Sequence, residues 1–299
     1  MARGPCLRPN TDRGALVPRL VIAPEGVSVP TARNRASASP QVWRDAQGTT
    51  LASCDTIDGQ PRVDVNGVGA FHVDSLSGTV TAYPRDAVPS VMIDEAYTRW
   101  VLPIVLQAHG TEVLHASAVR ARGVVALCAD SGVGKSTLAF ALSRRGHQLW
   151  ADDALAIGIR GPSAVAFALP FEMRLRPRSA AFFGVEVKTD RALASEPADD
   201  RPRPSEAPIT AVFVLRRCES GHGDRGVSVE RLRPPMAVSA LLAHAYCFSL
   251  EDPDLKRAMV AHYVDLAARV PVFALRFRPG LGMLRSMVDQ IEAVAHSVA

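Results

Sequence analysis

Apolar and polar positions alternate in three short runs, at residues 62–65, 70–74 and 79–83. A period of two is typical of strands that bury one face. The dipeptides Asn66-Gly67 and Ser77-Gly78 separate the runs, and glycine in such dipeptides suits the tight turns that join antiparallel strands. The pattern therefore predicts a β-meander.

A helical period replaces this alternation between Ile93 and Ala108, where apolar residues recur at every fourth position from Ala96 to Ile104. Asp94 and Glu95 would then lie in the first turn, where the helix dipole favours acidic side chains. We expect a helix that connects the meander to the rest of the chain.

Two apolar strands are predicted at residues 112–119 and 123–128, and the short link between them favours an antiparallel hairpin. After a loop that contains glycines, a helix is expected from Lys135 to Arg145, ended by Gly146. A short strand, Gln148–Ala151, then runs into two aspartates. Strand, loop, helix and strand in this order are typical of the phosphate-binding unit of α/β folds.

The predicted elements divide the chain into three parts. Residues 1–19 lack periodicity and are expected to be irregular, residues 20–92 form a small mostly-β region, and residues 93–299 form an α/β domain with a mobile loop at residues 188–208. Further elements of that domain are strands at residues 211–216, 227–232 and 272–276, a helix opened by Pro234-Pro235, and helices at residues 255–268 and 283–296.

The composition is that of a globular protein, with 47% hydrophobic and 21% charged residues among 299. No run approaches the roughly 18 apolar residues that span a bilayer, and the first residues lack the apolar core of a secretory signal. The five scattered cysteines form no C-x-x-C pair, and the net charge of +4 comes without a basic run interleaved with aromatics. We therefore expect a cytoplasmic protein that binds neither membranes nor nucleic acids.

The segment Ala129–Thr137 carries the clearest chemistry and reads A-D-S-G-V-G-K-S-T. It fits the phosphate-binding pattern G-x-x-x-x-G-K-[ST], with alanine in place of the first glycine. Gly132 and Gly134 let the backbone curl so that successive N–H groups face one anion, and the following helix points its positive end at the same place. Lys135 would reach the β and γ phosphates of ATP, and Ser136 would offer its hydroxyl to Mg²⁺. The residues expected to hold the nucleotide are Asp130, Ser131, Gly132, Val133, Gly134, Lys135, Ser136 and Thr137.

Asp152 and Asp153 follow a strand that should neighbour the strand before this loop, at the edge where open α/β sheets bind ligands. Phosphoryl transfer needs one carboxylate to hold Mg²⁺, and a kinase needs another to take the proton of the attacking hydroxyl. Adjacent strand residues point to opposite faces, which favours a division of these roles, although an aspartate here could instead cap a following turn. His115 lies in the strand expected to pair with the loop strand, where it either reaches the aspartates or is a core residue.

Three segments together resemble the catalytic core of bacterial HPr kinase/phosphorylase: Leu114-His115-Ala116, the loop from Ala129 to Ser136, and Arg145–Asp153, which reads R-G-H-Q-L-W-A-D-D. In that family a histidine precedes the P-loop, and an R-G-H motif leads into an aspartate pair whose second member is the base toward the substrate serine. The resemblance covers about residues 112–155. It implies an α/β fold with a P-loop core and a mixed sheet, of the type shared with ATP-dependent phosphoenolpyruvate carboxykinase.

Carried over residue by residue, the resemblance implies that Asp153 accepts the proton, His115 supports it, Lys135 binds phosphate and Ser136 binds Mg²⁺. Asp152, the other member of the pair, is then the carboxylate that holds Mg²⁺.

Downstream, the family's Gly-rich signature with its Mg²⁺-binding glutamate is not found, and Glu172 is the candidate to stand in for it. Arg174, Arg176 and Arg178 alternate along the same segment. They either contact phosphate or an acidic partner, or form a solvated face.

The first 110 residues differ from the N-terminal domain usual in that family. The whole chain is more similar to the HPr-kinase-like proteins encoded in bacterial clusters for ribosomally made, modified peptides, some of which phosphorylate a serine in a lasso peptide. The implied partner is a protein or peptide that carries Ser or Thr. Because the family tends to be hexameric, the resemblance also implies a homo-oligomer.

The leading hypothesis is an ATP-dependent and Mg²⁺-dependent serine kinase. One alternative is a non-catalytic or merely hydrolytic nucleotide switch, and another is a small-molecule kinase or carboxykinase-like enzyme. The pair of aspartates separates the first two, since a switch needs one Mg²⁺-linked carboxylate and has no use for a second one aimed at a substrate hydroxyl.

Overall fold

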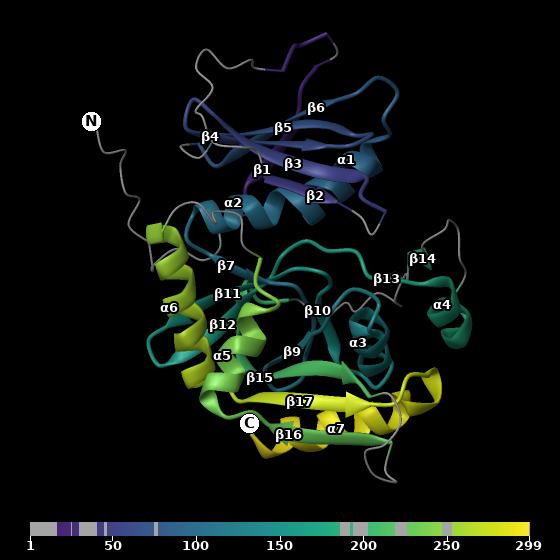
Figure 1. The fold of residues 1–299 in the computed structure, drawn as a ribbon. Helices are drawn as coiled ribbons and strands as arrows, with labels where there is room; N and C mark the ends of the chain where they lie inside the picture. Colours follow the sequence, from purple (N-terminus) through teal and green to yellow (C-terminus); the bar gives the residue numbers. More distant parts are fainter. Residues whose placement is uncertain are drawn as a thin grey trace. The chain divides into compact units, whose positions relative to one another are not determined.

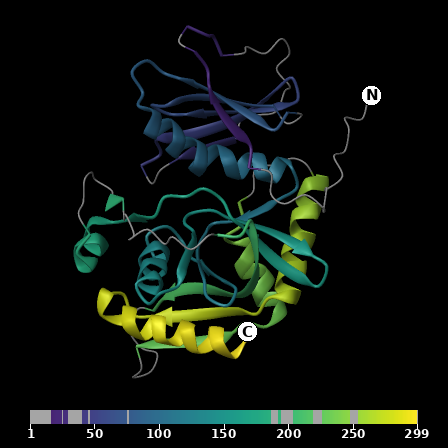
Figure 2. The ribbon, with the colours of Figure 1, turned by 180° about the vertical axis from the view of Figure 1, so that it is seen from behind.

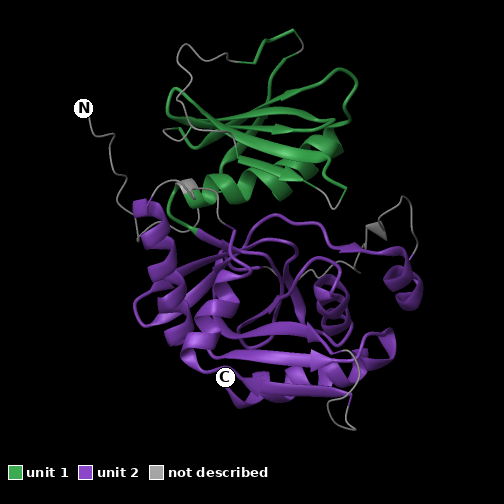
Figure 3. Cartoon of the chain, in the orientation of Figure 1, with its two compact units in different colours: residues 1–111 green, residues 112–299 purple. Residues whose placement is uncertain are grey.

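The chain forms two compact units, Met1–Thr111 and Glu112–Ala299 (Figure 3). The predicted connecting helix thus belongs to the first unit, whereas the sequence placed it with the second domain. Much of the predicted irregular N-terminus and of the predicted loop at 188–208 lies outside the described residues. The computed structural model describes residues 17–24, 26–29, 41–44, 47–74, 77–185, 192–193, 203–218, 226–246 and 253–298.

Unit 1 contains a six-stranded sheet in the order β1-β6-β5-β4-β3-β2. The predicted meander is confirmed, because β4, β5 and β6 pair in antiparallel fashion one after another. Only β1 runs parallel to its neighbour, β6. The strands are β1 (Arg19–Ile22), β2 (Gln41–Arg44), β3 (Thr50–Ile57), β4 (Gln60–Val65), β5 (Gly69–Asp74) and β6 (Thr79–Pro84).

The predicted helix after the meander is present but interrupted. It comprises α1 (Ser90–Ala96), a π-helical turn (Tyr97–Val101) and α2 (Leu102–Ala108). Pro103 has no N–H to donate to the preceding turn, which explains why the regular α-helical ladder breaks there. The helix also begins at Ser90, so the expectation that acidic residues occupy its first turn was wrong.

Unit 2 is built on a mixed nine-stranded sheet that divides at β15. This strand pairs with β12 near its start and, along its second half, with both β9 and β17. The strands are β7 (Glu112–Leu114), β8 (Ala116–Arg120), β9 (Val124–Cys128), β10 (Gln148–Ala151), β11 (Leu155–Arg160), β12 (Ser163–Phe167), β15 (Glu206–Arg217), β16 (Val227–Arg231) and β17 (Val272–Phe277), and a separate pair is formed by β13 (Arg174–Leu175) and β14 (Ala192–Leu193).

Helices cover both faces of this sheet. One apolar core contains side chains of α3 and α7, and a second contains side chains of α5 and α6. In both views α5 lies beside α6, and α7 runs along β16 (Figures 1 and 2). Within the described ranges, no helix has the length and apolar character that crossing a bilayer requires. The helices are α3 (Lys135–Ser143), α4 (Pro177–Phe183), α5 (Pro234–Leu242), α6 (Pro253–Arg269), a 3₁₀ turn (Leu281–Met283) and α7 (Leu284–Ser297).

Two details of strand pairing correct the sequence-based prediction. The hairpin of β8 and β9 is antiparallel as expected, but β10 pairs with β8 rather than with β9. The strand predicted at 112–119 is also broken at His115, because β7 pairs with β11 while β8 pairs with β9. Since β10 and β9 are both antiparallel to β8, their carboxyl ends still lie at the same edge of the sheet.

Candidate functional site

A glycine loop, defined here as Ala129–Gly134, joins the buried strand β9 to the N-terminus of α3. Gly132 and Gly134 have φ angles of 84° and 123°, which side chains with a Cβ rarely adopt. Among the described residues, the backbone N–H groups of Gly132, Gly134 and Lys135 have no protein acceptor. Unpaired N–H groups at a helix N-terminus are the donors that bind anions in other proteins.

Lys135 is the first residue of α3, and its side chain is nearly inaccessible, at 5% exposure. Its Nζ donates to the carbonyl oxygen of Ala129 at 2.8 Å and lies 2.9 Å from Nε2 of His115. Burial lowers the pKa of Lys135, and nearby carboxylates, Asp153 first, oppose this shift. Burial and the Lys135 charge also lower the pKa of His115, so we assign the imidazole as neutral, with Nε2 as acceptor.

His115 is fixed at the break between β7 and β8. Its ring Nδ1 lies 3.0 Å from the carbonyl oxygen of Asp153, to which it donates in the assigned tautomer. Its backbone N–H donates to the carbonyl of His244 at 2.8 Å, next to a β-bridge between Leu114 and Ala245. His115 therefore contacts the main chain of the aspartate pair rather than a carboxylate.

The Asp152 carboxylate is buried at 7% exposure, just after β10. Its Oδ1 accepts hydrogen bonds from Ser117 Oγ at 2.6 Å and Ser136 Oγ at 2.8 Å, and its Oδ2 accepts one from the Arg174 N–H at 3.3 Å. Burial, followed by the charge of Asp153, raises the pKa of Asp152 to about 6, and the three hydrogen bonds act in the opposite direction. The structure thus brings a carboxylate onto the first turn of α3.

Asp153 differs from Asp152 in both backbone and side chain. Its φ of 63° is in the left-handed region, which a non-glycine residue seldom occupies. Its carbonyl also accepts a hydrogen bond from the hydroxyl of Tyr246 at 3.3 Å. No hydrogen bond or ion pair joins its carboxylate to another residue that the structure describes, although that carboxylate is close enough to influence the pKa of Lys135.

Two arginines lie against the glycine loop. Arg217, at the end of β15, donates to the carbonyls of Gly132 and Val133 at 2.5 and 3.3 Å. The Arg176 guanidinium is so close to Gly132 that an added Cβ would meet its Nη2 at 2.9 Å. Within the described part of the chain neither arginine is paired with a carboxylate, so both leave positive charge at the loop.

The other predicted site residues lie around this centre. Asp130 and Ser131 are exposed at the tip of the loop, and Thr137 Oγ1 lies 2.9 Å from Ser179 Oγ. Glu172 has a half-exposed side chain whose carboxylate lies 3.2 Å from Arg174 Nη2. No group of three or more His, Cys, Asp or Glu side chains within the described ranges is arranged to hold a metal.

Sequence reasoning missed Ser117, Arg217 and Tyr246. Ser117 and Tyr246 lie in apolar segments with no recognisable motif, so no signal pointed to them. Arg217 follows the apolar stretch of β15, which is parallel to β9. A charged residue at the end of a strand that is parallel to β9 indicates a position near the glycine loop. This signal could be used only if the pairing of β15 with β9 were already known.

The R-G-H motif lies at the other end of β10. Arg145 Nη2 forms ion pairs with Asp289 at 2.7 Å and Glu292 at 2.9 Å, both on α7. His147 Nε2 is 3.0 Å from Glu292 Oε1. Among the residues singled out in the sequence, these two therefore attach α7 to the α3–β10 turn and are not brought to the aspartate pair.

Comparison with known proteins gives structural likeness but no match to a family model or to a curated protein. Among solved structures, the HPr(Ser) kinase/phosphatase from Coxiella burnetii is similar, at 14% identity and a TM-score of 0.31, over 62% of this chain and 98% of that one. A likeness of this size carries no conclusion about activity. The chain is an α/β protein with mixed sheets, and its chemistry has to be inferred from the side chains of the site.

Proposed function

We propose that the chain is an ATP-dependent kinase that transfers the γ-phosphoryl group to a Ser or Thr hydroxyl of a protein or peptide. The observation that carries this proposal is the 2.8 Å hydrogen bond from Ser136 Oγ to Asp152 Oδ1. In P-loop proteins, Mg²⁺ has two protein ligands of this kind. One is a hydroxyl at the start of the helix that follows the glycine loop, and the other is a carboxylate at the end of a nearby strand.

The donor set fits a nucleotide bound with Mg²⁺. Hydroxyl and carboxylate oxygens are hard ligands of the kind that Mg²⁺ prefers, and Ser136 and Asp152 supply them. When bound, the ion would neutralise charge on the β and γ phosphates. The free N–H groups of Gly132 and Gly134 and the ammonium of Lys135 supply the remaining positive potential for the phosphates.

Asp153 is the proton acceptor in this proposal. The acceptor hydroxyl oxygen forms a bond to the γ phosphorus while the bond from that phosphorus to the bridging oxygen breaks, and ADP leaves with the electron pair. The hydroxyl proton passes to the Asp153 carboxylate, which has no other described hydrogen-bond partner. His115 and Tyr246 are positioning residues, since both bond to the Asp153 carbonyl.

The difference between the two aspartates favours transfer over a nucleotide switch. Asp152 alone satisfies the need for an Mg²⁺-linked carboxylate, because it is already bonded to Ser136. Asp153 is held in a left-handed conformation and leaves its carboxylate unbonded among the described residues. A switch has no role for a second carboxylate held in this way.

The test measures label transfer from γ-labelled ATP to peptides that end in Ser, together with intact-mass detection of the gain of about 80 Da per phosphoryl group. We expect Asp153→Asn to lower the transfer rate on the order of 10²- to 10⁴-fold, because the general base is lost. ATP binding should persist. The matched control, Asp265→Asn, changes a half-exposed aspartate of α6 and should leave the rate unchanged.

Undiminished transfer by Asp153→Asn would overturn the assignment of the base. Absence of transfer from the unaltered protein to every Ser and Thr peptide, despite tight ATP binding, would instead support the switch.

A further inference from the structure

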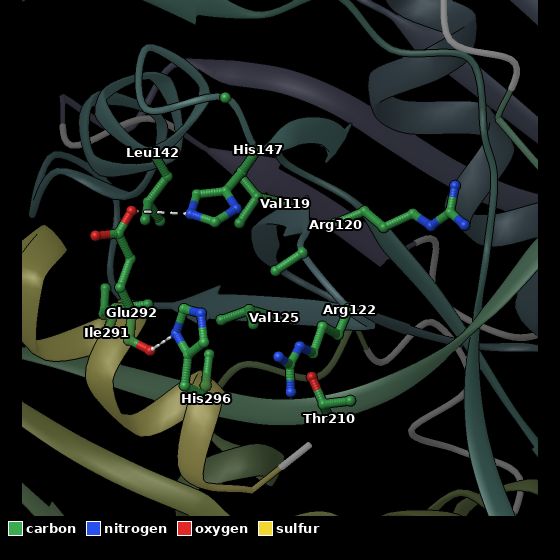
Figure 4. A pocket seen from close by; sticks show the side chains of 13 residues that line it. Val119, Arg120, Arg122, Val125, Leu142, His147, Thr210, Ile291, Glu292 and His296 are labelled. Atoms are coloured by element: carbon green, nitrogen blue, oxygen red, sulfur yellow. Dashed lines mark hydrogen bonds and ion pairs between the residues drawn. The ribbon is translucent and has the colours of Figure 1, made fainter.

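A pocket of about 210 Å³ lies at the end of α3 opposite the glycine loop. Residues of the β8–β9 hairpin, the α3–β10 turn and α7 line it (Figure 4). The R-G-H motif contributes one wall through Gly146 and His147. The proposed kinase reaction uses none of these residues, so the pocket is independent of it.

The floor of the pocket is apolar. Val125, Leu142 and Ile291 lie beneath it, from a strand and two helices, and are at most 1% exposed, while the more exposed Ala121 and Ala295 line the accessible space. A cavity of about 150 Å³ lined by such side chains holds one benzene molecule. The pocket therefore has room for one small ring or a short alkyl chain.

The rim carries an uncompensated positive charge. Arg122, in the hairpin, forms no ion pair or hydrogen bond with any residue that the structure describes. Figure 4 shows its guanidinium extending from the hairpin toward His296. Among the described residues that line the pocket, Glu292 supplies the carboxylate, and that group is bonded to Arg145 and His147 rather than to Arg122.

A histidine ring faces the same space. The Nδ1 of His296 lies 2.6 Å from the Glu292 carbonyl, to which it donates. Its other ring nitrogen is directed into the pocket in Figure 4. With Nδ1 as donor, the neutral imidazole presents an acceptor there, so the anionic group of a ligand is left to pair with Arg122.

We propose that this pocket binds a small carboxylate with an apolar body, such as a monocyclic aromatic acid. The ring or chain lies over this floor and against Ala295, and the carboxylate pairs with Arg122. A bare phosphate would leave that floor unfilled, whereas a neutral ring would leave the guanidinium without an anion. Carboxylate and apolar body are therefore both required.

Calorimetric and NMR titrations of the full chain with benzoate, benzamide and inorganic phosphate test this proposal. We expect benzoate to bind most tightly, and Arg122→Gln to weaken it about tenfold or more, because a charge-assisted hydrogen bond is lost. Arg144→Gln is the matched control, since Arg144 is an exposed arginine at the end of α3 that does not line the pocket. It should leave benzoate affinity unchanged.

Ala295→Phe provides a test that does not alter charge. Ala295 lines the pocket from α7, and a phenyl ring there should fill it and abolish benzoate binding. The proposal is overturned if benzoate does not bind, if benzamide or phosphate binds as well as benzoate, or if Arg144→Gln weakens binding as much as Arg122→Gln. These titrations measure binding alone, so their outcome does not depend on whether the protein transfers phosphate from ATP.

Discussion

The two ends of β10 carry similar side chains in different surroundings. At its start, Arg145 and Asp289 form an ion pair whose side chains are 43% and 48% exposed. At its end, Lys135, Asp152 and His115 interact in a region where the lysine is 5% exposed and Asp152 is 7% exposed. Burial is the largest cause of the pKa shifts of Lys135, Asp152 and His115, whereas hydrogen bonds are the largest cause of those of Arg145 and Glu292.

Solvent explains this difference. Exposed ion pairs are screened by water and contribute little to stability, while buried charges lose hydration and have shifted pKa values. At the carboxyl end of β10 the buried charges have lost hydration, and this loss lowers the stability of the folded state. Buried and strained groups without compensating stability are typical of functional sites. The pairs at the start of β10 link the α3–β10 turn to α7, whose apolar side chains pack in the core, and the groups at its end are those that the proposed reaction uses.

The largest effect is expected for Lys135→Met. Methionine preserves much of the buried volume but removes the ammonium that lies near His115 and Asp153. Phosphoryl transfer should fall on the order of 10²- to 10⁴-fold, because charge stabilisation of the phosphates is lost, while the protein remains folded. Arg144→Met, at the exposed end of α3, is the control and should retain its rate. Equal losses of transfer rate in the two variants would show that the buried charge of Lys135 has no special role in phosphoryl transfer.

The next effect concerns stability and its dependence on pH. The pKa of Asp152 rises from 3.8 to about 6 on folding, so the folded state holds a proton that the unfolded state has released between these values. The contribution of Asp152 to stability should therefore be level below about pH 4, fall as the pH rises to about 6, and stay level above it. Asp152→Asn should raise the free energy of unfolding at pH 8 by about 1–3 kcal/mol and change it little at pH 4. The variant should also lose Mg²⁺-dependent transfer.

Chemical denaturation at both pH values measures this effect. Asp289→Asn provides the control on the exposed side of the comparison, and its free energy of unfolding should keep the pH dependence of the unaltered chain, because Asp152 is unchanged. A destabilised Asp152→Asn protein at pH 8 would mean that the hydrogen bonds from Ser117 and Ser136 outweigh the cost of burying the charge.

The smallest effect is expected at the start of β10. Arg145→Gln removes the ion pairs with Asp289 and Glu292. Because these side chains are solvated, Tm should fall by at most a few degrees at low salt, with the difference shrinking at about 1 M salt. Transfer activity should not change. A large loss of activity in a well-folded variant would show that the R-G-H motif acts in the reaction after all.

Local patterns in the sequence predicted much of the fold. Alternation located β4–β6, and the antiparallel hairpin of β8 and β9 followed from its short link. The interruption at Pro103 and the separation of β10 from β9 were missed. The β11–β12 hairpin was overlooked, because short apolar runs give no distinctive period. Pairing between distant strands depends on packing that a single sequence does not reveal.

The candidate site was predictable to the extent that it is contiguous in sequence. The loop and the aspartate pair are such segments, and the structure brings Ser136 and Asp152 into contact. Ser117, Arg217 and Tyr246 reach the site from three other segments that carry no motif. Their contribution depends on the break at His115 and on the length of β15, which only the tertiary structure shows.

The most direct test of the central claim measures equilibrium binding of a non-hydrolysable ATP analogue with and without Mg²⁺. The chain and its Ser136→Ala and Asp152→Asn variants are compared. The claim predicts that Mg²⁺ strengthens binding to the unaltered chain and that either variant loses most of this enhancement while still binding the metal-free analogue. Mg²⁺ enhancement that is equal in all three proteins would contradict the proposed site.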